Sequence, residues 1–322
     1  MNRSKNILIL GGTGFIGKNI FSFYEDFINS QGYVDEVNFY FLVNKNTHLF
    51  NSPNFSFIDG NFFDKERMCY IFNNYHFDEV WHFISSSVPK NSGNNIIVDI
   101  QKDLISTVHL LELMRLHKIK KIIYLSSGGS IYGESHIHEQ FQEDFCNNSS
   151  SAYGCLKLCI ENYIKLYGLS YQIDYRIYRL SNLFGKHHVN PNNGFINIAI
   201  RNALNDEDVT IWGNGTQSKD FIFASDFAKI FWEMERQNLP TGIYNIGSGE
   251  MKSLVSIINI LKLHFPNIKL NFIDSANFDV NLVEFDISKL KYYITPFYID
   301  FNKAIQDTID FEREISNKSK LL

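Results

Sequence analysis

The sequence is poor in cysteine, in charge of one sign and in long hydrophobic runs. Four of its 322 residues are cysteines, at positions 69, 146, 155 and 159, and no two of them have the Cys-x-x-Cys spacing of a zinc or redox site. No apolar run approaches the ~20 residues that span a bilayer. The N-terminal residues lead directly into a predicted strand and leave no room for a cleavable signal. We therefore predict a cytoplasmic protein of a reducing compartment, without a membrane partner.

The charged residues are balanced, with 30 basic and 35 acidic side chains and a formal charge of −5 at pH 7. Neither sign forms a block, which argues against nucleic acid as a partner. The chain has 44% hydrophobic and 20% charged residues, a composition that is typical of globular proteins and excludes a disordered or coiled-coil chain. Its length fits one large domain or two of ordinary size.

Short apolar runs alternate with longer amphipathic stretches in the first half of the chain. The predicted strands are residues 7–10, 38–43, 55–58, 79–84, 121–126 and 174–179, and the clearest helices are residues 15–28, 99–116 and 152–167. Apolar strands separated by helices indicate a parallel sheet that is buried on both faces. Right-handed crossovers make this an α/β, doubly wound Rossmann sheet, with its ligand crevice at the carboxyl ends of the strands.

A glycine-rich turn follows the first predicted strand, with the sequence Gly11-Gly12-Thr13-Gly14-Phe15-Ile16-Gly17. Gly11 permits the tight turn, Gly14 lets backbone N–H groups approach a pyrophosphate, and Gly17 lets the helix pack against the strand. The phosphates would lie at the positive end of the helix dipole. This strand, turn and helix predict a dinucleotide site.

The ends of the second and third strands bear on the choice of dinucleotide. A carboxylate after the second strand would bind the ribose hydroxyls of NAD, but the sequence there is Val43-Asn44-Lys45. The missing carboxylate, next to a lysine, favours NADP and leaves NAD open. Asn61 and Phe62, after the third strand, are candidates for the edge and the face of the adenine ring.

The pattern becomes less regular after residue 182. It predicts a helix at 192–208, a short extended segment at 209–212 and a helix at 253–265. This part is too short and irregular for a second Rossmann unit. We predict a dinucleotide-binding domain over residues 1–181, to which residues 220–247 return, and a smaller C-terminal α/β substrate lid over residues 182–322.

Tyr153 and Lys157 are four residues apart and share one face of the predicted helix. An ammonium ~4 Å away, at an effective dielectric near 20, favours the phenolate by up to ~4 kcal/mol. A tyrosine tuned in this way can exchange a proton with a sugar hydroxyl while nicotinamide takes or gives a hydride at the same carbon. The pair follows a strand that ends in Ser126-Ser127, where a hydroxyl can reach the same substrate.

With these motifs the chain resembles the extended short-chain dehydrogenase/reductases, the NAD-dependent epimerase/dehydratase family that modifies nucleotide-activated sugars. The resemblance extends from residue 7 to about residue 310. On the cofactor side, residues 11–17 are similar to the family's dinucleotide fingerprint, and residues 78–85 to the fourth strand along the cofactor. At the active site, residues 126–133 are similar to the fifth-strand segment, and Tyr153 and Lys157 to the catalytic pair. Residues 179–185 resemble the segment that reaches nicotinamide and the sugar diphosphate, and residues 211–215, 219–221 and 244–249 resemble motifs on the nucleotide side of the substrate.

The motifs and the resemblance together imply a set of site residues. Tyr153, Lys157 and Ser127 are the predicted catalytic residues, and no metal is expected. The predicted cofactor-binding residues are Gly11, Thr13, Gly14, Phe15, Ile16, Gly17, Asn44, Asn61, Phe62, Ile84, Ser85, Ser126, Tyr153 and Lys157. The predicted contacts with the nucleotide-activated sugar are Ser127, Ser130, Asn182 and Lys219.

The chain departs from the family pattern at several positions. Gly128 stands where the family usually has serine or threonine, so the catalytic hydroxyl must come from Ser127 or Ser130, or be absent. Gly128 and Gly129 also replace the Asp-Glu pair that a 4,6-dehydratase uses for elimination, so dehydratase chemistry is not expected. Lys219 replaces an arginine, which keeps the charge but loses bidentate binding of the diphosphate. No arginine occurs near residues 277–280, where the family often has another phosphate contact.

Other residues have simpler interpretations. His82 lies in an apolar strand and is predicted to be a core histidine, and the pairs His187-His188 and His136-x-His138 are predicted to lie in loops. Cys155 and Cys159 share a helix face and are predicted to be buried thiols. Asp103 is assigned to an interface or to packing. The helices at 99–116 and 152–167 resemble the pair that forms the four-helix bundle of a homodimer in this family.

Three functions follow from these observations. The favoured one is an NAD(P)H-dependent reductase of an NDP-4-keto-6-deoxyhexose, which the resemblance places in surface polysaccharide precursor synthesis. The alternative is an NDP-hexose 4-epimerase, similar to UDP-glucose 4-epimerase, that retains NAD. A third, of another class, is a non-catalytic dinucleotide-binding regulator, against which the Tyr153–Lys157 pair argues.

Overall fold

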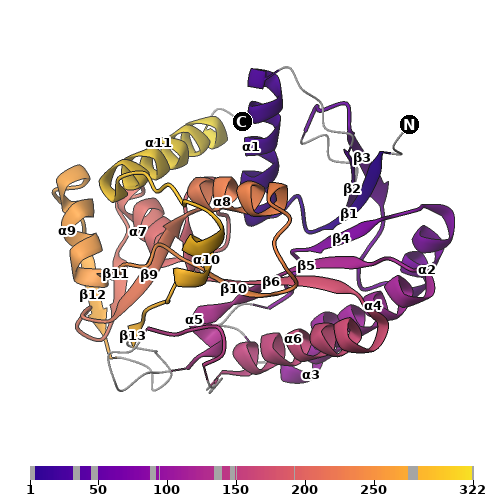
Figure 1. Cartoon of the computed structure of the whole chain (residues 1–322). Coiled ribbons are helices and arrows are strands. Elements are labelled where there is room, and N and C mark those ends of the chain that lie inside the picture. Colours follow the sequence, from indigo (N-terminus) through magenta and orange to yellow (C-terminus); the bar gives the residue numbers. More distant parts are fainter. Residues whose placement is uncertain are drawn as a thin grey trace.

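A parallel sheet forms the centre of the protein in the computed structural model (Figure 1). The structure describes residues 4–31, 37–44, 50–87, 92–93, 95–133, 140–145, 149, 151–191, 193–274 and 282–320. Within these residues the sheet has seven strands in the order β10-β6-β5-β4-β1-β2-β3. Every neighbouring pair is parallel, so the predicted doubly wound sheet is confirmed. The strands are β1 (Lys5–Leu10), β2 (Val37–Val43), β3 (Phe55–Asp59), β4 (Glu79–His82), β5 (Lys121–Ser127), β6 (Asp174–Leu180) and β10 (Gly242–Ile246).

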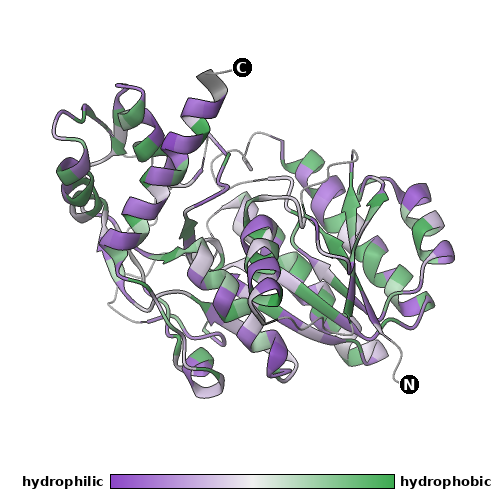
Figure 2. Cartoon of the chain, turned by 90° about the horizontal axis from the view of Figure 1, so that it is seen from above, coloured by the Kyte–Doolittle hydropathy of each residue, from purple (hydrophilic) through white to green (hydrophobic). Residues whose placement is uncertain are grey.

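Successive apolar side chains of each strand enter two different cores, because side chains alternate between the faces of a sheet. In β1, Ile7 and Ile9 join the cluster on one face, and Leu8 and Leu10 join the cluster on the other. This explains why the strands are apolar throughout, and Figure 2 shows hydrophobic strands beneath helices with hydrophilic outer faces. The layers are visible in Figure 1: α1 (Phe15–Gln31) and α8 (Ala224–Arg236) cover one face, and α2 (Lys65–Asn74), α4 (Ser106–Leu116) and α6 (Ala152–Tyr171) cover the other.

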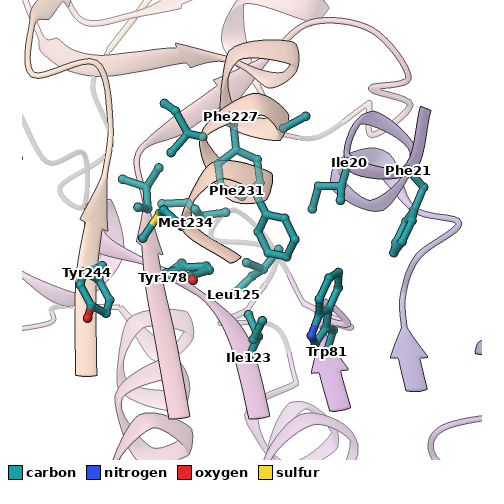
Figure 3. Packing of buried hydrophobic residues seen from close by; sticks show 14 of the residues in the cluster. Ile20, Phe21, Trp81, Ile123, Leu125, Tyr178, Phe227, Phe231, Met234 and Tyr244 are labelled. Carbon is teal, nitrogen blue, oxygen red and sulfur yellow. The ribbon is translucent and has the colours of Figure 1, made fainter. Parts of the chain in front are cut away.

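The core beneath α1 and α8 is mainly aromatic. Phe21 of α1 packs edge-on against Phe41 at a centroid distance of 4.6 Å, and Phe231 of α8 packs edge-on against Trp81 at 5.1 Å. Figure 3 shows Phe21 and Phe231 on the two helices and Trp81 on the strand below them. Edge-to-face aromatic pairs add about 0.5–1.5 kcal/mol to the effect of burial alone. This cluster therefore fixes α1, and with it the glycine-rich turn that precedes the helix.

The residues after β6 form smaller sheets. One sheet contains β7 (Asn182–Phe184), β9 (Ser218–Phe223), β11 (Met251–Ser253) and β13 (Leu282–Val283), and β8 (Val209–Trp212) pairs with β12 (Leu270–Ile273). A third core joins these strands to three helices, α7 (Phe195–Leu204), α9 (Leu254–His264) and α11 (Phe301–Lys320). Between them, β10 returns to the edge of the main sheet beside β6. The proposed domain limits remain a prediction.

Short helical segments complete the described chain. A π-helical segment, η1 (Ile100–Ile105), joins α3 (Ile96–Asp99) to α4, while α5 (Gly128–Ile131) follows β5 and α10 (Ser288–Tyr293) lies against β10. No helix among the described residues is long and apolar enough to span a membrane.

Three local predictions need correction. The helix expected at 192–208 is shorter, because Gly194 has a φ of +92° and α7 begins only after it. The strand β4 ends at His82, and Ile84 lies instead against Gly11 of the glycine turn. Cys155 and Cys159 are exposed rather than buried, because the inward face of α6 is that of Leu156, Lys157 and Ile160.

The aromatic core leads to a stability prediction. Phe21→Ala removes a side chain with no exposed surface and leaves a cavity under α1, so we expect the free energy of unfolding to fall by about 3–5 kcal/mol. Phe272→Ala in β12, where the side chain is 54% exposed, should change it by less than ~0.5 kcal/mol. Denaturant titration of both variants measures the difference, and equal losses would contradict this description of the core.

Candidate active site

Three glycines of the glycine turn have different steric surroundings. Gly11 has a φ of +83°, and a Cβ there would lie 3.0 Å from the Ile84 backbone nitrogen. A Cβ on Gly17 would lie 2.4 Å from the carbonyl oxygen of Gly12, so the start of α1 packs directly on the turn. At exposed Gly14 the nearest such contact is the Gly11 carbonyl oxygen at 3.3 Å, so this position is open towards solvent. The turn therefore fits a pyrophosphate at the N-terminus of α1.

Serines at the ends of β4 and β5 also fit a polar ligand. The hydroxyls of Ser126 and Ser87 are buried and have no hydrogen-bond partner among the described residues. Buried polar atoms normally have partners, so these two are available to a bound dinucleotide. Thr13, Phe15 and Ile16, at the turn, are half-buried.

The residues predicted for the adenosine end are only partly placed as expected. Asn44 is exposed at the end of β2, and Asn61 is exposed with its side-chain oxygen accepting a hydrogen bond from the Phe63 N–H at 3.1 Å. Phe62 is different, since its ring is 4% exposed and packs against His82 at a centroid distance of 4.9 Å. Phe62 thus belongs to the core, and its ring face is not free for adenine. Lys45 lies outside the described residues.

Hydrogen bonds to β5 hold the Lys157 side chain near the Tyr153 ring. Ser151 caps α6 by accepting a hydrogen bond from the Gly154 N–H at 3.1 Å, which places Tyr153 in the first turn. Lys157 is 3% exposed, and its Nζ donates to the Tyr124 hydroxyl at 3.0 Å and to the Leu125 carbonyl at 3.1 Å. The same Nζ lies 5.7 Å from the centroid of the Tyr153 ring. The structure therefore brings the predicted pair together.

The expected effect of Lys157 on the Tyr153 phenol is not found in the free protein. Burial raises the pKa of Tyr153 to about 12, hydrogen bonding with Ser85 and Ser127 opposes this shift, and the charge of Asp103 adds to it. Burial also lowers the pKa of Lys157 to about 8, against the charges of Asp103 and Glu161. The hydrogen bonds of Lys157 Nζ go to Tyr124 and Leu125. Tyr153 is thus a neutral phenol at pH 7.

Ser127 is the hydroxyl that reaches Tyr153. It hydrogen bonds with the phenol, while Ser130 contacts Ser127 at an Oγ–Oγ distance of 3.4 Å. The neighbouring Gly128 cannot carry a side chain, because its Cβ would lie 2.3 Å from the ring of Phe285. The glycine that departs from the family pattern at position 128 therefore leaves room for Phe285, which comes from the distant C-terminal part of the chain.

A second buried network supports the same helix. The Glu161 carboxylate accepts from Arg179 Nη2 at 2.7 Å, and the two side chains are at most 1% exposed. Arg179 also lies over the Tyr132 ring at 4.9 Å, and the Tyr132 hydroxyl donates to Asn245 Oδ1 at 2.6 Å. Glu161 is not among the residues predicted for the site, although its spacing of four residues from Lys157 places it on the face of Tyr153.

Asn182 and Lys219 lie on the smaller sheet. The Asn182 amide donates to the Asp220 carbonyl at 3.0 Å, and the Asp220 carboxylate accepts from the Ser248 and Gly249 N–H groups, both at 2.8 Å. Lys219 is the neighbour of Asp220 on β9 and is opposite Lys252 on β11. The contacts of Asn182 and Asp220 thus join β7, β9 and the turn after β10, and the substrate role of Asn182 and Lys219 remains a prediction.

The histidines have structural contacts. His82 is buried, its Nε2 lies 3.0 Å from Thr107 Oγ1, and burial, followed by the charge of Lys157, lowers its pKa to about 3. His187 packs edge-on against Phe311, and His188 against Phe15. His136 and His138 lie outside the described residues. Across the described ranges, no cluster of three or more His, Cys, Asp or Glu side chains could hold a metal ion.

This combination of a parallel sheet, a glycine turn and a tyrosine–lysine pair defines a dinucleotide-dependent enzyme. Residues 7–247 match the model of the NAD dependent epimerase/dehydratase family. The chain belongs to this family, which confirms the resemblance to the extended short-chain dehydrogenase/reductases that modify nucleotide-activated sugars.

Comparison with individual proteins agrees with this assignment. A putative UDP-glucose 4-epimerase of Methanocaldococcus jannaschii is 33% identical over 258 residues, 80% of this chain and 81% of that protein. A dTDP-4-dehydro-6-deoxyglucose reductase of Escherichia coli is 26% identical over 294 residues, 89% of this chain and 90% of that protein. The crystal structure of a Thermotoga maritima UDP-glucose 4-epimerase with UDP-glucose has the same fold, with a TM-score of 0.84, 24% identity and coverage of 97% and 99% of the two chains.

The glycine turn allows ligand binding and packing to be separated by two variants. Gly14→Ala adds a methyl group on the open side of the turn and should weaken dinucleotide binding about tenfold or more, with less than ~0.5 kcal/mol lost from the free energy of unfolding. Gly17→Ala forces a contact with the Gly12 carbonyl and should destabilise the protein itself by about 1–3 kcal/mol. Titration calorimetry and thermal unfolding separate the two effects. Unchanged dinucleotide binding by Gly14→Ala would place the pyrophosphate elsewhere.

Proposed function

We propose that this protein transfers hydride at carbon 4 of a nucleotide-linked hexose and acts as an NAD-dependent 4-epimerase. The observation that carries the proposal is the continuous path from the glycine turn to the phenol: Gly11 lies against Ile84, and the next residue, Ser85, hydrogen bonds with Tyr153. A nicotinamide held by the turn along this path would meet a sugar held by Tyr153 and Ser127.

The proposed reaction moves a hydride from carbon 4 and a proton from the hydroxyl on that carbon. Bound nicotinamide supplies the acceptor and donor of the hydride. With the dinucleotide bound, Tyr153 would be a phenolate and would take the proton from the hydroxyl at carbon 4 as the C–H bond breaks, which leaves a 4-keto sugar. Ser127 orients the oxygen by hydrogen bonding, and Lys157 supplies positive charge beneath the phenol. Rotation of the keto sugar, return of the hydride to the opposite face of carbon 4 and return of the proton to the oxygen give the epimer.

Two observations favour epimerisation. The putative UDP-glucose 4-epimerase is 33% identical to this chain over 80% of its length. Gly128 and Gly129 provide no carboxylate or phenol for eliminating a neighbouring substituent, and Phe285 fills the space where a side chain on Gly128 would stand. These features support chemistry that is confined to the carbon that carries the hydride.

A second candidate is the NAD(P)H-dependent reductase of a 4-keto-6-deoxyhexose for surface polysaccharide precursors. Exposed Asn44 in place of a carboxylate after β2 favours it, because the site would then admit the phosphate of NADP. The similarity to the Escherichia coli reductase extends over 89% of this chain. The non-catalytic regulator has no comparable support, since Tyr153, Lys157 and Ser127 come together.

A second copy of the chain is the proposed partner besides the sugar. Large apolar side chains are exposed on the adjoining elements α3, η1 and α6, among them Ile97 at 65%, Ile105 at 42%, Tyr163 at 41% and Leu166 at 51%. Exposed apolar patches of this kind mark interaction surfaces. An antiparallel pairing of this face with itself would bury all four side chains.

The dimer can be tested with one charge. Leu166→Arg should convert the protein to a monomer in light scattering coupled to gel filtration, because it places a charge in an apolar interface. Leu263→Arg on α9, where the side chain is 79% exposed, is the matched control and should leave the mass unchanged. A monomeric wild-type protein would contradict the proposed dimer.

The proposed reaction can be tested by identifying the dinucleotide that the protein retains and by removing the Tyr153 hydroxyl. Protein purified without added cofactor should release about one equivalent of NAD on denaturation, and Tyr153→Phe should retain it while losing about 10²–10⁴-fold in kcat. Tyr171→Phe, at the end of the same helix, should have normal activity. Protein free of dinucleotide that consumes NADPH with a 4-keto sugar would establish the reductase instead.

A further inference from the structure

Asp103 is a buried carboxylate next to the proposed active site, and it has no role in the reaction proposed above. It is 4% exposed, and its two oxygens each accept from the Ser86 N–H at 3.0 Å. The Ser85 hydroxyl lies 3.3 Å from Asp103 Oδ2 and 3.1 Å from the Ser87 carbonyl. Asp103 therefore holds the turn after β4, the segment that passes from the glycine turn to Tyr153. Its burial agrees with the predicted assignment to an interface or to packing.

The π-helical segment η1 places this carboxylate inside the protein. Asp103 is its buried residue, and one turn later Thr107 Oγ1 donates to the Asp103 carbonyl at 2.6 Å. Thr107 in turn contacts His82 of β4. Isolated π-turns within helices often occur at functional sites. Here the wider turn directs Asp103 towards Ser85 and fixes it against β4.

Other charged and titratable groups around Tyr153 and Lys157 are accounted for by their own contacts. Glu161 of α6 is paired with Arg179, Tyr124 of β5 accepts from Lys157, and His82 of β4 is neutral at pH 7. The described part of the chain shows no cation paired with Asp103. Its negative charge therefore acts through space on the Tyr153 phenol, on the Lys157 ammonium, which it attracts, and on the Asp99 carboxylate of α3.

We propose that Asp103 is a positioning residue for Tyr153, which fixes the Ser85 hydroxyl against the phenol and sets the pH range in which the phenol gives up its proton. The proposal rests on the proposed function of Tyr153. The charge of Asp103 raises the pKa of both Tyr153 and Lys157. Removing that charge should therefore let both groups lose their protons at lower pH.

Asp103→Asn is the direct test, because the amide oxygen can still accept from the Ser86 N–H. We expect the rising limb of the pH profile of kcat/KM to move about one unit towards acid, so that the relative rate on this limb increases about tenfold. Asp99→Asn, one helical turn earlier and only half-buried, is the control and should leave the profile in place. A purely structural role would lower kcat/KM equally at all pH values, and that result would overturn the proposal.

Two further measurements cover the other outcomes. If Asp103→Asn does not fold, Ser85→Ala keeps the carboxylate but removes a hydrogen bond that lowers the pKa of Tyr153, so it should lower kcat and move the rising limb towards alkaline pH; an unchanged kcat would contradict the positioning role. The second measurement needs no substrate. Titration of tyrosinate absorbance, as the difference between each protein and its Tyr153→Phe counterpart, should show Tyr153 ionising at lower pH in Asp103→Asn. This shift without sugar turnover would leave the inference standing while the proposed function fails, and its absence would reject the inference.

Discussion

The burial of Lys157 is the constraint on which the site depends. An ammonium that is 3% exposed loses its hydration, and the lowered pKa of about 8 records this loss. The charge survives because the Tyr124 hydroxyl and the Leu125 carbonyl accept from it, and because Asp103 and Glu161 lie near it. Removing one partner of a buried charge costs about 3–5 kcal/mol. Strand β5, helix α6 and segment η1 are therefore locked together where the reaction would occur.

Burial also makes the free protein hold its proton on Tyr153 more tightly. A phenol is already neutral at pH 7, and desolvation raises the pKa of Tyr153 further, to about 12. A positively charged nicotinamide would add the charge that the lysine alone does not supply. Proton transfer would then be coupled to the presence of the cofactor, since the phenol becomes acidic only when the site is complete. This coupling fits an enzyme that must not react with an empty site.

Much of this could be predicted from local patterns. The apolar run of β1, the glycine turn and the spacing of Tyr153 and Lys157 are short-range features, and each was placed correctly. The remaining details depend on long-range contacts: Tyr124 precedes Lys157 by 33 positions, and Phe285 reaches Gly128 from near the C-terminus. Sequence also gives no direction for an isolated ring, so Phe62 was assigned to adenine although it points into the core. Likewise, the amphipathic pattern of α6 did not show that Cys155 and Cys159 lie on its outer face.

In the proposed reaction, one hydride leaves and returns to carbon 4 while Tyr153 moves the proton. It is tested most directly with a nucleotide hexose that carries deuterium at carbon 4, incubated with the protein in ordinary water and analysed by NMR. We expect inversion at carbon 4 with the deuterium still attached to that carbon, because the label would be held on the nicotinamide and not exchanged with solvent. Inversion with loss of deuterium to water, or loss of a proton from a neighbouring carbon, would contradict it.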